Sequence, residues 1–232
     1  MPDSPSVPGP ETNLKNTVLS TAAGLTQPLA PLKNICAHLN AFHTYADSPG
    51  HAVETDHYCA HLSNSVRQCL LYDSAEPNAR LIGIEYMITP DLYCGLDAEE
   101  RKLWHSHVFE VKSGMLAMPK PATVPEVAWE FAEKKEMEEV VGLYGKVFHL
   151  WDTRDALPLG LPRLMTSFTE ASQVDESVWR ERDERMGIDR ERKVEGRKGI
   201  EEPSLHADAD AAWKGNIAAI VEHCLMSKEK GL

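Results

Sequence analysis

Apolar residues in the chain form short runs, several of which have the composition of strands. Residues 80–89 (RLIGIEYMIT) are rich in Ile and Tyr and stop at Pro90, a pattern that predicts a buried strand. The stretch HSHVFEVKSGMLAMP, residues 105–119, predicts a second strand. A later stretch, DALPLGLPRLMTSF over residues 155–168, predicts another strand or an extended edge.

Other apolar positions recur every three or four residues, which predicts helices. A weakly amphipathic helix is expected within residues 13–30, and a short one within residues 96–104, where Asp97 is in an N-cap position. Residues 133–151 predict a long helix, and the segment 208–225 predicts a C-terminal one.

These elements interleave without a regular βαβ alternation, which favours an α+β fold: a single globular domain with a small sheet packed by helices. A length of 232 residues is compatible with one domain. Within residues 175–202 the two signs of charge interleave, as is typical of a solvated helical face or a mobile segment. We expect a disordered leader over residues 1–12 and one domain over residues 13–225. Within that domain the core is expected at residues 31–168, the mixed-charge segment at 175–202 and the C-terminal helix at 208–225.

Composition narrows the classes of function. The net charge of −12 argues against nucleic acid as a partner, because binding to phosphates needs clustered Lys and Arg. No apolar run approaches the length needed to cross a bilayer, so no transmembrane segment is expected. The cysteine count of five is odd and includes no CxxC pair. This pattern predicts free, mostly buried thiols and a cytoplasmic, reduced setting.

Histidines supply the main candidates for chemistry. His105 and His107 are two residues apart, so in a strand they project from one face, as a metal site requires. Glu110 follows, which is similar to the HxH-then-Glu pattern of cupins, although one residue too close and on the opposite strand face. Glu85, from a neighbouring strand, is the alternative carboxylate of a 2-His-1-carboxylate site for Zn, Fe or Mn.

His57 and His61 form a second candidate pair. They are four residues apart, so on a helix they lie on one face, as in two-histidine metal sites. His38 and His43, five apart, diverge on a helix, although one of them could converge with His57 or His61 across a helix pair. His149, near the end of the predicted long helix, is expected to complement the helix dipole. The structural alternative for all these residues is hydrogen bonding within the core.

Several catalytic classes lack their sequence motifs. The sequence contains no GxSxG elbow of lipases and esterases, no HExxH of zinc proteases, and no GxGxxG or Walker A loop for nucleotides. Tyr86, Met87, Trp104 and Phe109 are candidates to line a pocket for a small apolar ligand, with ordinary core packing as the alternative.

Long stretches of the chain resemble a known family. The blocks PLAPLKNICAHLNAFHTYA, HYCAHLSNSVRQCLLYDS, EPNARLIGIEYMITPDLY, LWHSHVFEVKSGMLAMP and HLWDTRDALPLGLPRLMTSF together span about residues 28–170. They resemble the signature blocks of the oil body-associated proteins, a family of unknown mechanism found in plants, fungi and bacteria. The Pro-rich leader and acidic balance are more similar to fungal than to plant members.

The resemblance implies a non-enzymatic binding or interaction protein that is peripheral on lipid droplets. In this sequence only residues 13–30 would support such attachment. The residues themselves keep two alternatives open: a metal-dependent enzyme or metal-binding protein centred on His105 and His107, and a carrier of a small apolar ligand. The oligomeric state is left open.

Overall fold

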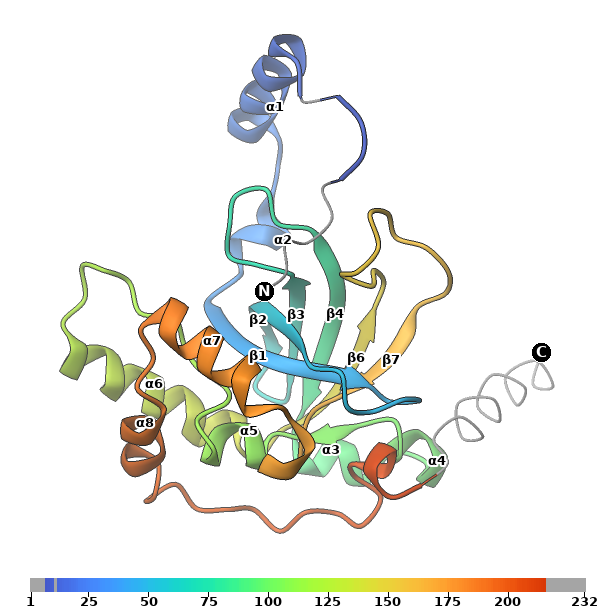
Figure 1. Cartoon of the computed structure of the whole chain (residues 1–232), viewed down its shortest axis with the longest axis vertical. Helices are drawn as coiled ribbons and strands as arrows, with labels where there is room; N and C mark the ends of the chain where they lie inside the picture. The colour runs from blue at the N-terminus through green and yellow to red at the C-terminus, as the bar shows by residue number, and fades with distance from the viewer. Residues whose placement is uncertain (1–6, 11, 216–232) are drawn as a thin grey trace.

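The computed structural model describes residues 7–10 and 12–215. Its centre is an antiparallel sheet with the strand order β4-β3-β2-β1-β7-β6-β5. Because β6 also pairs with β4, six of the strands close into a barrel (Figure 1). The two-residue β5 pairs with the start of β6. The strands are β1 (Ala37–Tyr45), β2 (Val53–Ser63), β3 (Val66–Tyr72), β4 (Leu81–Ile88), β5 (His105–Ser106), β6 (Tyr144–His149) and β7 (Arg163–Thr166).

The expected small sheet packed by helices is therefore wrong, because the barrel dominates the fold. The pairing of β4 with β6 closes the barrel, with Gly83 opposite His149 and Ile88 opposite Tyr144. These partners lie about sixty residues apart in the sequence, so periodicity within a short window carries no information about their pairing. Closure also leaves these six strands without unpaired edges.

Alternation along the strands separates an inner from an outer face. On β3, for example, Arg67, Cys69 and Leu71 are buried while the residues between them are partly exposed. The principal apolar cluster gathers such buried side chains from the strands and from the turn before β6: Tyr45, Val53, Cys59, Cys69, Leu71, Ile82, Met87, Leu143, Val147 and Met165.

Helices cover the barrel on the outside and at one end (Figure 1). Their bounds are α1 (Leu14–Thr26), α2 (Ala30–Lys33), α3 (Pro90–Cys94), α4 (Ala98–Arg101), α5 (Val108–Lys112), α6 (Glu126–Val140), α7 (Glu176–Met186) and α8 (Arg190–Gly196), with 3-10 turns η1 (Ala171–Gln173) and η2 (Ala211–Trp213). Leu39 and Ala41 of β1 pack against residues of α5 and α6. Phe42, on the other face of β1, packs with Trp179 of α7.

Several predicted elements need correction. Residues 133–151 are not one helix, because α6 ends at Val140 and the chain turns into β6. The second predicted strand, 105–119, is extended only at His105–Ser106 before α5 begins. The strand predicted at residues 80–89 is confirmed as β4, and that within residues 155–168 as β7, an internal strand of the barrel.

The mixed-charge segment 175–202 is ordered rather than a solvated face alone. It contains α7, which Asp175 caps by accepting a hydrogen bond from the Ser177 amide at 2.8 Å, and α8. Arg182 of α7 is fully buried, and its Nη1 donates to the side-chain oxygen of Asn40 at 2.7 Å and to the carbonyl of Met115 at 2.9 Å. This segment therefore ties the C-terminal half to β1.

The predicted N-terminal helix is present as α1, which projects from the barrel at the top of Figure 1. Asn13 caps it by accepting from the Asn16 amide at 2.9 Å, and none of its residues is buried. Among the residues that the structure describes, no helix is long and apolar enough to span a membrane. Most of the predicted leader (residues 1–6 and 11) and of the predicted C-terminal helix (residues 216–225) lies outside the described residues.

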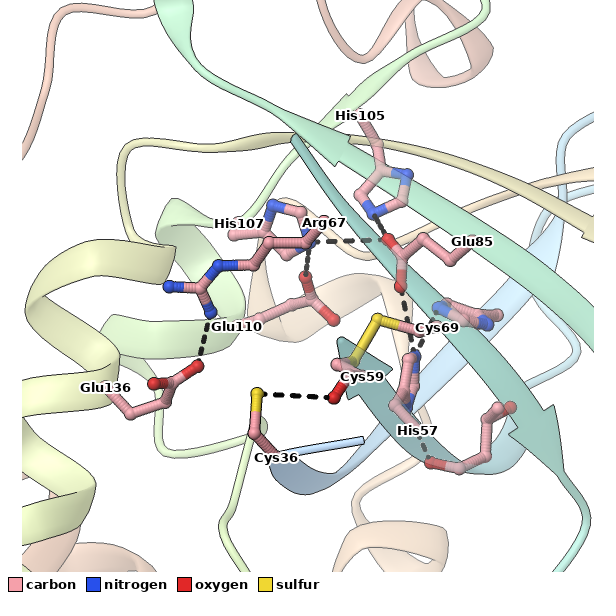
Figure 2. Close-up of a disulfide and its surroundings, with 12 residues drawn as sticks. Cys36, His57, Cys59, Arg67, Cys69, Glu85, His105, His107, Glu110 and Glu136 are labelled. Atoms are coloured by element: carbon pink, nitrogen blue, oxygen red, sulfur yellow. Dashed lines mark hydrogen bonds and ion pairs between the residues drawn. A yellow bond between two sulfur atoms is a disulfide. The ribbon is translucent and has the colours of Figure 1, made fainter. Parts of the chain in front are cut away.

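A disulfide joins Cys59 of β2 to Cys69 of β3, which are directly opposite each other in the strand register (Figure 2). The prediction of free thiols is thus wrong for these two residues. Cys36 and Cys94 are free and exposed, and the Cys36 thiol lies 3.6 Å from the carbonyl oxygen of Cys59.

Candidate metal centre

A group of ionisable side chains lies buried within the barrel strands and the segment after β5. Its members come from β1, β2, β4, β5, β6 and the start of α5, and each is no more than 2% exposed. We call this group the barrel cluster; it consists of His43, His57, Glu85, His105, His107, Glu110 and His149.

Strand alternation explains how the sequence assembles this cluster. His43 and His38 are an odd number of residues apart on β1, so His43 points inward, whereas His38 contacts Asp56 at 2.7 Å in a partly buried position. Glu85 is in the middle of β4, with Cys69 opposite on β3 and Val147 opposite on β6. Interior positions on several strands thereby converge on one carboxylate.

Glu85 is at the centre of the barrel cluster (Figure 2). Its Oε2 lies 3.4 Å from His57 Nε2, and its Oε1 lies 3.4 Å from the Nε2 atoms of both His105 and His107. Neither oxygen has a hydrogen-bond partner among the described residues. A buried carboxylate without hydrogen bonds is costly, so these two oxygens need a positively charged partner.

The imidazoles are oriented by hydrogen bonds through their other nitrogens. His57 Nδ1 donates to the carbonyl of Thr55 at 3.1 Å, and His107 Nδ1 donates to the carbonyl of Leu143 at 2.8 Å. Because a carbonyl only accepts, the proton is on Nδ1, and in the neutral ring Nε2 presents a lone pair toward Glu85. Metal-binding histidines are held in this way in many proteins.

His43 extends the arrangement on the Oε2 side. Its Nε2 lies 3.2 Å from His57 Nε2, and its Nδ1 lies 3.2 Å from His149 Nε2. When the proton of His43 is on Nδ1, this nitrogen donates a hydrogen bond to His149. Nε2 of His43 then carries a lone pair that can bind a metal beside Nε2 of His57. His149 is then the residue that orients His43.

Glu110 lies on the Oε1 side, with its Oε2 3.8 Å from His107 Nε2. This oxygen is buried and has no hydrogen-bond partner in the described part of the chain. His105 also lacks a hydrogen bond on both ring nitrogens there. The Oε1 side thus gathers several buried polar atoms whose hydrogen-bonding capacity is unused.

Gly145 of β6 leaves the space that Glu85 and His105 occupy. A Cβ atom at this position would overlap Glu85 Oε1 and would lie 2.7 Å from His105 Nε2. Any larger residue would therefore displace the central carboxylate or its imidazole neighbour.

Burial and neighbouring charges set the protonation of the cluster. Burial, together with nearby His57, lowers the pKa of His149 to about 3 and lowers the pKa of His43 well below its usual value. Burial alone raises the pKa of Glu85, but contacts with His105 and His107 more than offset this and hold it well below its usual range. Burial likewise opposes protonation of His107, yet contacts with Glu85 and Glu110 raise its pKa to about 9.

The ligand spacing matches that around a metal ion. A tetrahedral site with bonds of about 2.0–2.2 Å has ligand-to-ligand edges of about 3.3–3.6 Å, close to the 3.2 Å and 3.4 Å separations observed. A direct imidazolium–carboxylate hydrogen bond would instead be about 2.7–2.9 Å long. Mixed imidazole and carboxylate ligands suit Zn, Fe(II) and Mn.

The structure brings together five of the six metal-ligand candidates from the sequence: His57, Glu85, His105, His107 and Glu110. His61 is not among them, because its segment is strand β2 rather than a helix. The residue is exposed near the end of that strand. His43, one of the residues expected to be able to converge with His57, does so, but between strands and not across a helix pair. His149 is not among the ligands expected from the sequence. The expected dipole role of His149 is wrong, since it is on β6 and not at the end of a helix. Their inward positions follow only once β1 and β6 are recognised as strands.

The candidates for an apolar pocket are not brought together. Met87, Trp104 and Phe109 belong to three different apolar clusters. Tyr86 is exposed on β4 and lines a groove beneath α2 with residues such as Leu32 and Tyr58.

Comparison with known proteins places the chain in a family. Residues 29–201 match the description "Protein of unknown function (DUF1264)". The chain is 40% identical over 215 residues to oil body-associated protein 1B of Arabidopsis thaliana, covering 91% of this chain and 86% of that protein. It is 41% identical over 213 residues to oil body-associated protein 1A of Zea mays, covering 90% and 87%.

The chain belongs to the oil body-associated protein family. This result confirms the resemblance of the sequence blocks. The span that matches the family description contains the whole barrel cluster. No solved structure matches the chain significantly, so the barrel of this oil body-associated family member is described from its own strands.

Proposed function

We propose that this protein binds divalent transition metal inside its barrel, with Glu85, His57, His105 and His107 as ligands. The observation that supports this most strongly is Glu85 itself, whose two buried oxygens each face imidazole Nε2 atoms at 3.4 Å without a hydrogen bond in the described residues. The pKa of about 9 means that His107 carries a proton at neutral pH in the metal-free protein. A bound cation takes the place of that proton and converts these contacts into coordination bonds.

The burial of the site limits the size of any molecule that can reach a bound metal. Glu85 is 1% exposed, and the surrounding imidazoles are similarly covered. Such burial favours a stably held ion over a centre that admits a large substrate. The proposed role is thus metal binding, with any reaction limited to small molecules such as water or dioxygen.

Metal content of protein purified without a His-tag or chelators tests this role. Inductively coupled plasma mass spectrometry should detect at least one equivalent of Zn, Fe or Mn per chain, and His57→Ala should reduce this content. His61→Ala is the matched control, because His61 is on the same strand but exposed. Metal-free protein that also takes up no added Zn²⁺, Fe²⁺ or Mn²⁺ would overturn the proposal.

A second function, peripheral attachment to the surface of lipid droplets in the cytoplasm, is supported by α1. Leu14 is 80% exposed and Leu25 is 84% exposed, with Val18 also exposed on the same side. On a helix these three positions fall within about 40° of one another. Proteins named for oil bodies are among the relatives, and an apolar helix face can insert into a lipid surface.

Imaging in lipid-loaded cells separates this attachment from the barrel. Deletion of residues 1–27 should disperse the protein from droplets while leaving its metal content unchanged. Thr17→Ala with Thr21→Ala is the control, because it alters α1 without removing an apolar side chain. Unchanged droplet targeting of the truncated protein would rule α1 out as the anchor.

A further inference from the structure

The two oxygens of Glu85 face two separate sets of imidazoles (Figure 2). One set of ligand atoms consists of His43, His57 and Glu85, and the other of Glu85, His105 and His107. Within each set all ligand atoms lie within 4.8 Å of one another, and the sets share only Glu85. Each is by itself a 2-His-1-carboxylate arrangement.

A single ion does not account for both sets. With bonds of about 2.1 Å, ligands of one ion are at most about 4.2 Å apart. Oε2 contacts His57, whereas Oε1 contacts His105 and His107. The ligand atoms of the two sets do not all lie within 4.8 Å of one another, so no single position is within bonding distance of every ligand. The ligand positions therefore divide into two sites on opposite oxygens of one carboxylate.

We propose that the barrel holds two divalent transition-metal ions bridged by Glu85. One ion is bound by Oε2 with His43 and His57, and the other by Oε1 with His105 and His107. This inference rests on the metal-binding function proposed above and makes it a dinuclear centre. Ions bridged in this way are about 3.5–4 Å apart.

Residues around the two sites support the division. On the Oε1 side, Glu110 offers a second carboxylate oxygen, buried and without a hydrogen bond in the described residues, 3.8 Å from His107 Nε2. It adds negative charge where a second cation would otherwise be poorly compensated. On the Oε2 side, His149 contacts His43 Nδ1 at 3.2 Å and orients that ring. Each site thus has its own additional residue.

The test is the number and magnetic coupling of bound Co²⁺ ions in the full chain. Co²⁺ is paramagnetic and binds imidazole and carboxylate ligands more strongly than Mn²⁺ or Fe²⁺. Chelator-treated protein is dialysed against Co²⁺, and bound metal is counted; electron paramagnetic resonance and magnetic susceptibility report whether the ions interact. We expect two ions per chain with exchange coupling between them.

Variants assign the ions to their sites. His43→Ala and His107→Ala should each reduce the count from two ions to one and abolish the coupling, because each removes a ligand from a different site. His38→Ala is the control, since His38 contacts Asp56 away from the cluster and should retain both ions. Circular dichroism verifies that each variant is folded.

The outcomes separate the two proposals. One ion per chain in the wild type overturns the dinuclear centre and leaves the metal-binding function intact. Two ions without magnetic coupling overturn the Glu85 bridge. No bound Co²⁺ in folded wild-type protein overturns both proposals.

Discussion

Two buried charged regions of this protein differ in how their carboxylates are compensated. Outside the barrel, Glu54 receives two hydrogen bonds of 2.6 Å from Arg185, and Glu133 receives bonds of 2.6 and 2.7 Å from Lys193. Inside the barrel, the partners of Glu85 in the part of the chain that the structure describes are imidazole nitrogens at 3.4 Å. Both regions bury carboxylates, but only the outer one compensates them with permanent cations.

We call the group outside the barrel the outer ionic network, and it joins β2 and α6 to α7 and α8. It consists of Asn40, Glu54, Glu133, Arg182, Asp183, Arg185, Lys193 and Arg197. Its short, charge-assisted bonds fix the position of the C-terminal helices, a structural role. The barrel cluster has wider spacings and unused acceptors, which a structural role leaves unexplained. A buried charged side chain therefore indicates a ligand site when its partners within the protein are too distant for direct hydrogen bonds.

The largest expected effect comes from breaking the outer network. Arg182→Ala should lower the free energy of unfolding by about 3–5 kcal/mol, because Asp183 and Asn40 lose a fully buried partner. Arg180→Ala, an exposed neighbour on α7, should change it by less than about 0.5 kcal/mol. Urea denaturation of both variants measures the difference. Equal stability of the two would refute a structural role for the network.

Metal should stabilise the protein through the barrel cluster alone. At a free metal concentration of about one hundred times Kd, linkage raises the unfolding free energy by about 2.7 kcal/mol for each bound ion. Glu85→Gln should abolish this increment, because it removes the shared anionic ligand, whereas Arg182→Ala should retain it. Denaturation with and without added Zn²⁺ gives the result. A wild-type increment that persists in Glu85→Gln would place the metal elsewhere.

Gly145 provides a steric probe of the same site. Gly145→Ala should cost about 1–3 kcal/mol, because the new methyl group overlaps Glu85 and His105. It should also eliminate the metal-dependent increment. Gly142→Ala is the matched control, since its Cβ would meet only a carbonyl oxygen at 4.0 Å. Calorimetry with and without metal compares the two, and full metal-linked stabilisation of Gly145→Ala would contradict the described geometry.

The smallest stability effect is expected in α1, which belongs to neither buried region. Leu14→Ser with Leu25→Ser should change the unfolding free energy by less than about 0.5 kcal/mol, because both side chains are exposed. Binding to phospholipid-coated oil droplets should weaken at least about tenfold, since burying a leucine is worth about 1.5–3 kcal/mol. Flotation assays measure this; unchanged binding would exclude these leucines from the contact.

The sequence predicts local parts of this fold better than their assembly. The Ile- and Tyr-rich run of β4 and the amphipathic α1 are evident from composition and spacing. Tyr144, Val147 and Phe148 continue the helical spacing of α6, which conceals β6 and with it the closure of the barrel. Local periodicity is ambiguous for such short apolar runs.

The candidate site shows the same limit. The pair His105 and His107, with Glu85 as the alternative carboxylate, could be proposed from spacing and residue type. The four-residue distance from His61 favours His57 as a ligand on a helix, yet its actual position comes from strand alternation on β2. His43 and His149 reach the cluster through pairings across the barrel that no local pattern encodes.

A crystal structure of the metal-loaded protein, with anomalous diffraction collected at the metal absorption edge, gives the most direct test of metal binding in the barrel. We expect anomalous peaks beside Glu85, about 2.0–2.2 Å from its oxygens and from Nε2 of His57 and His105. This expectation would be contradicted if the barrel contained no peak and Glu85 formed direct hydrogen bonds of about 2.7–2.9 Å with the imidazoles.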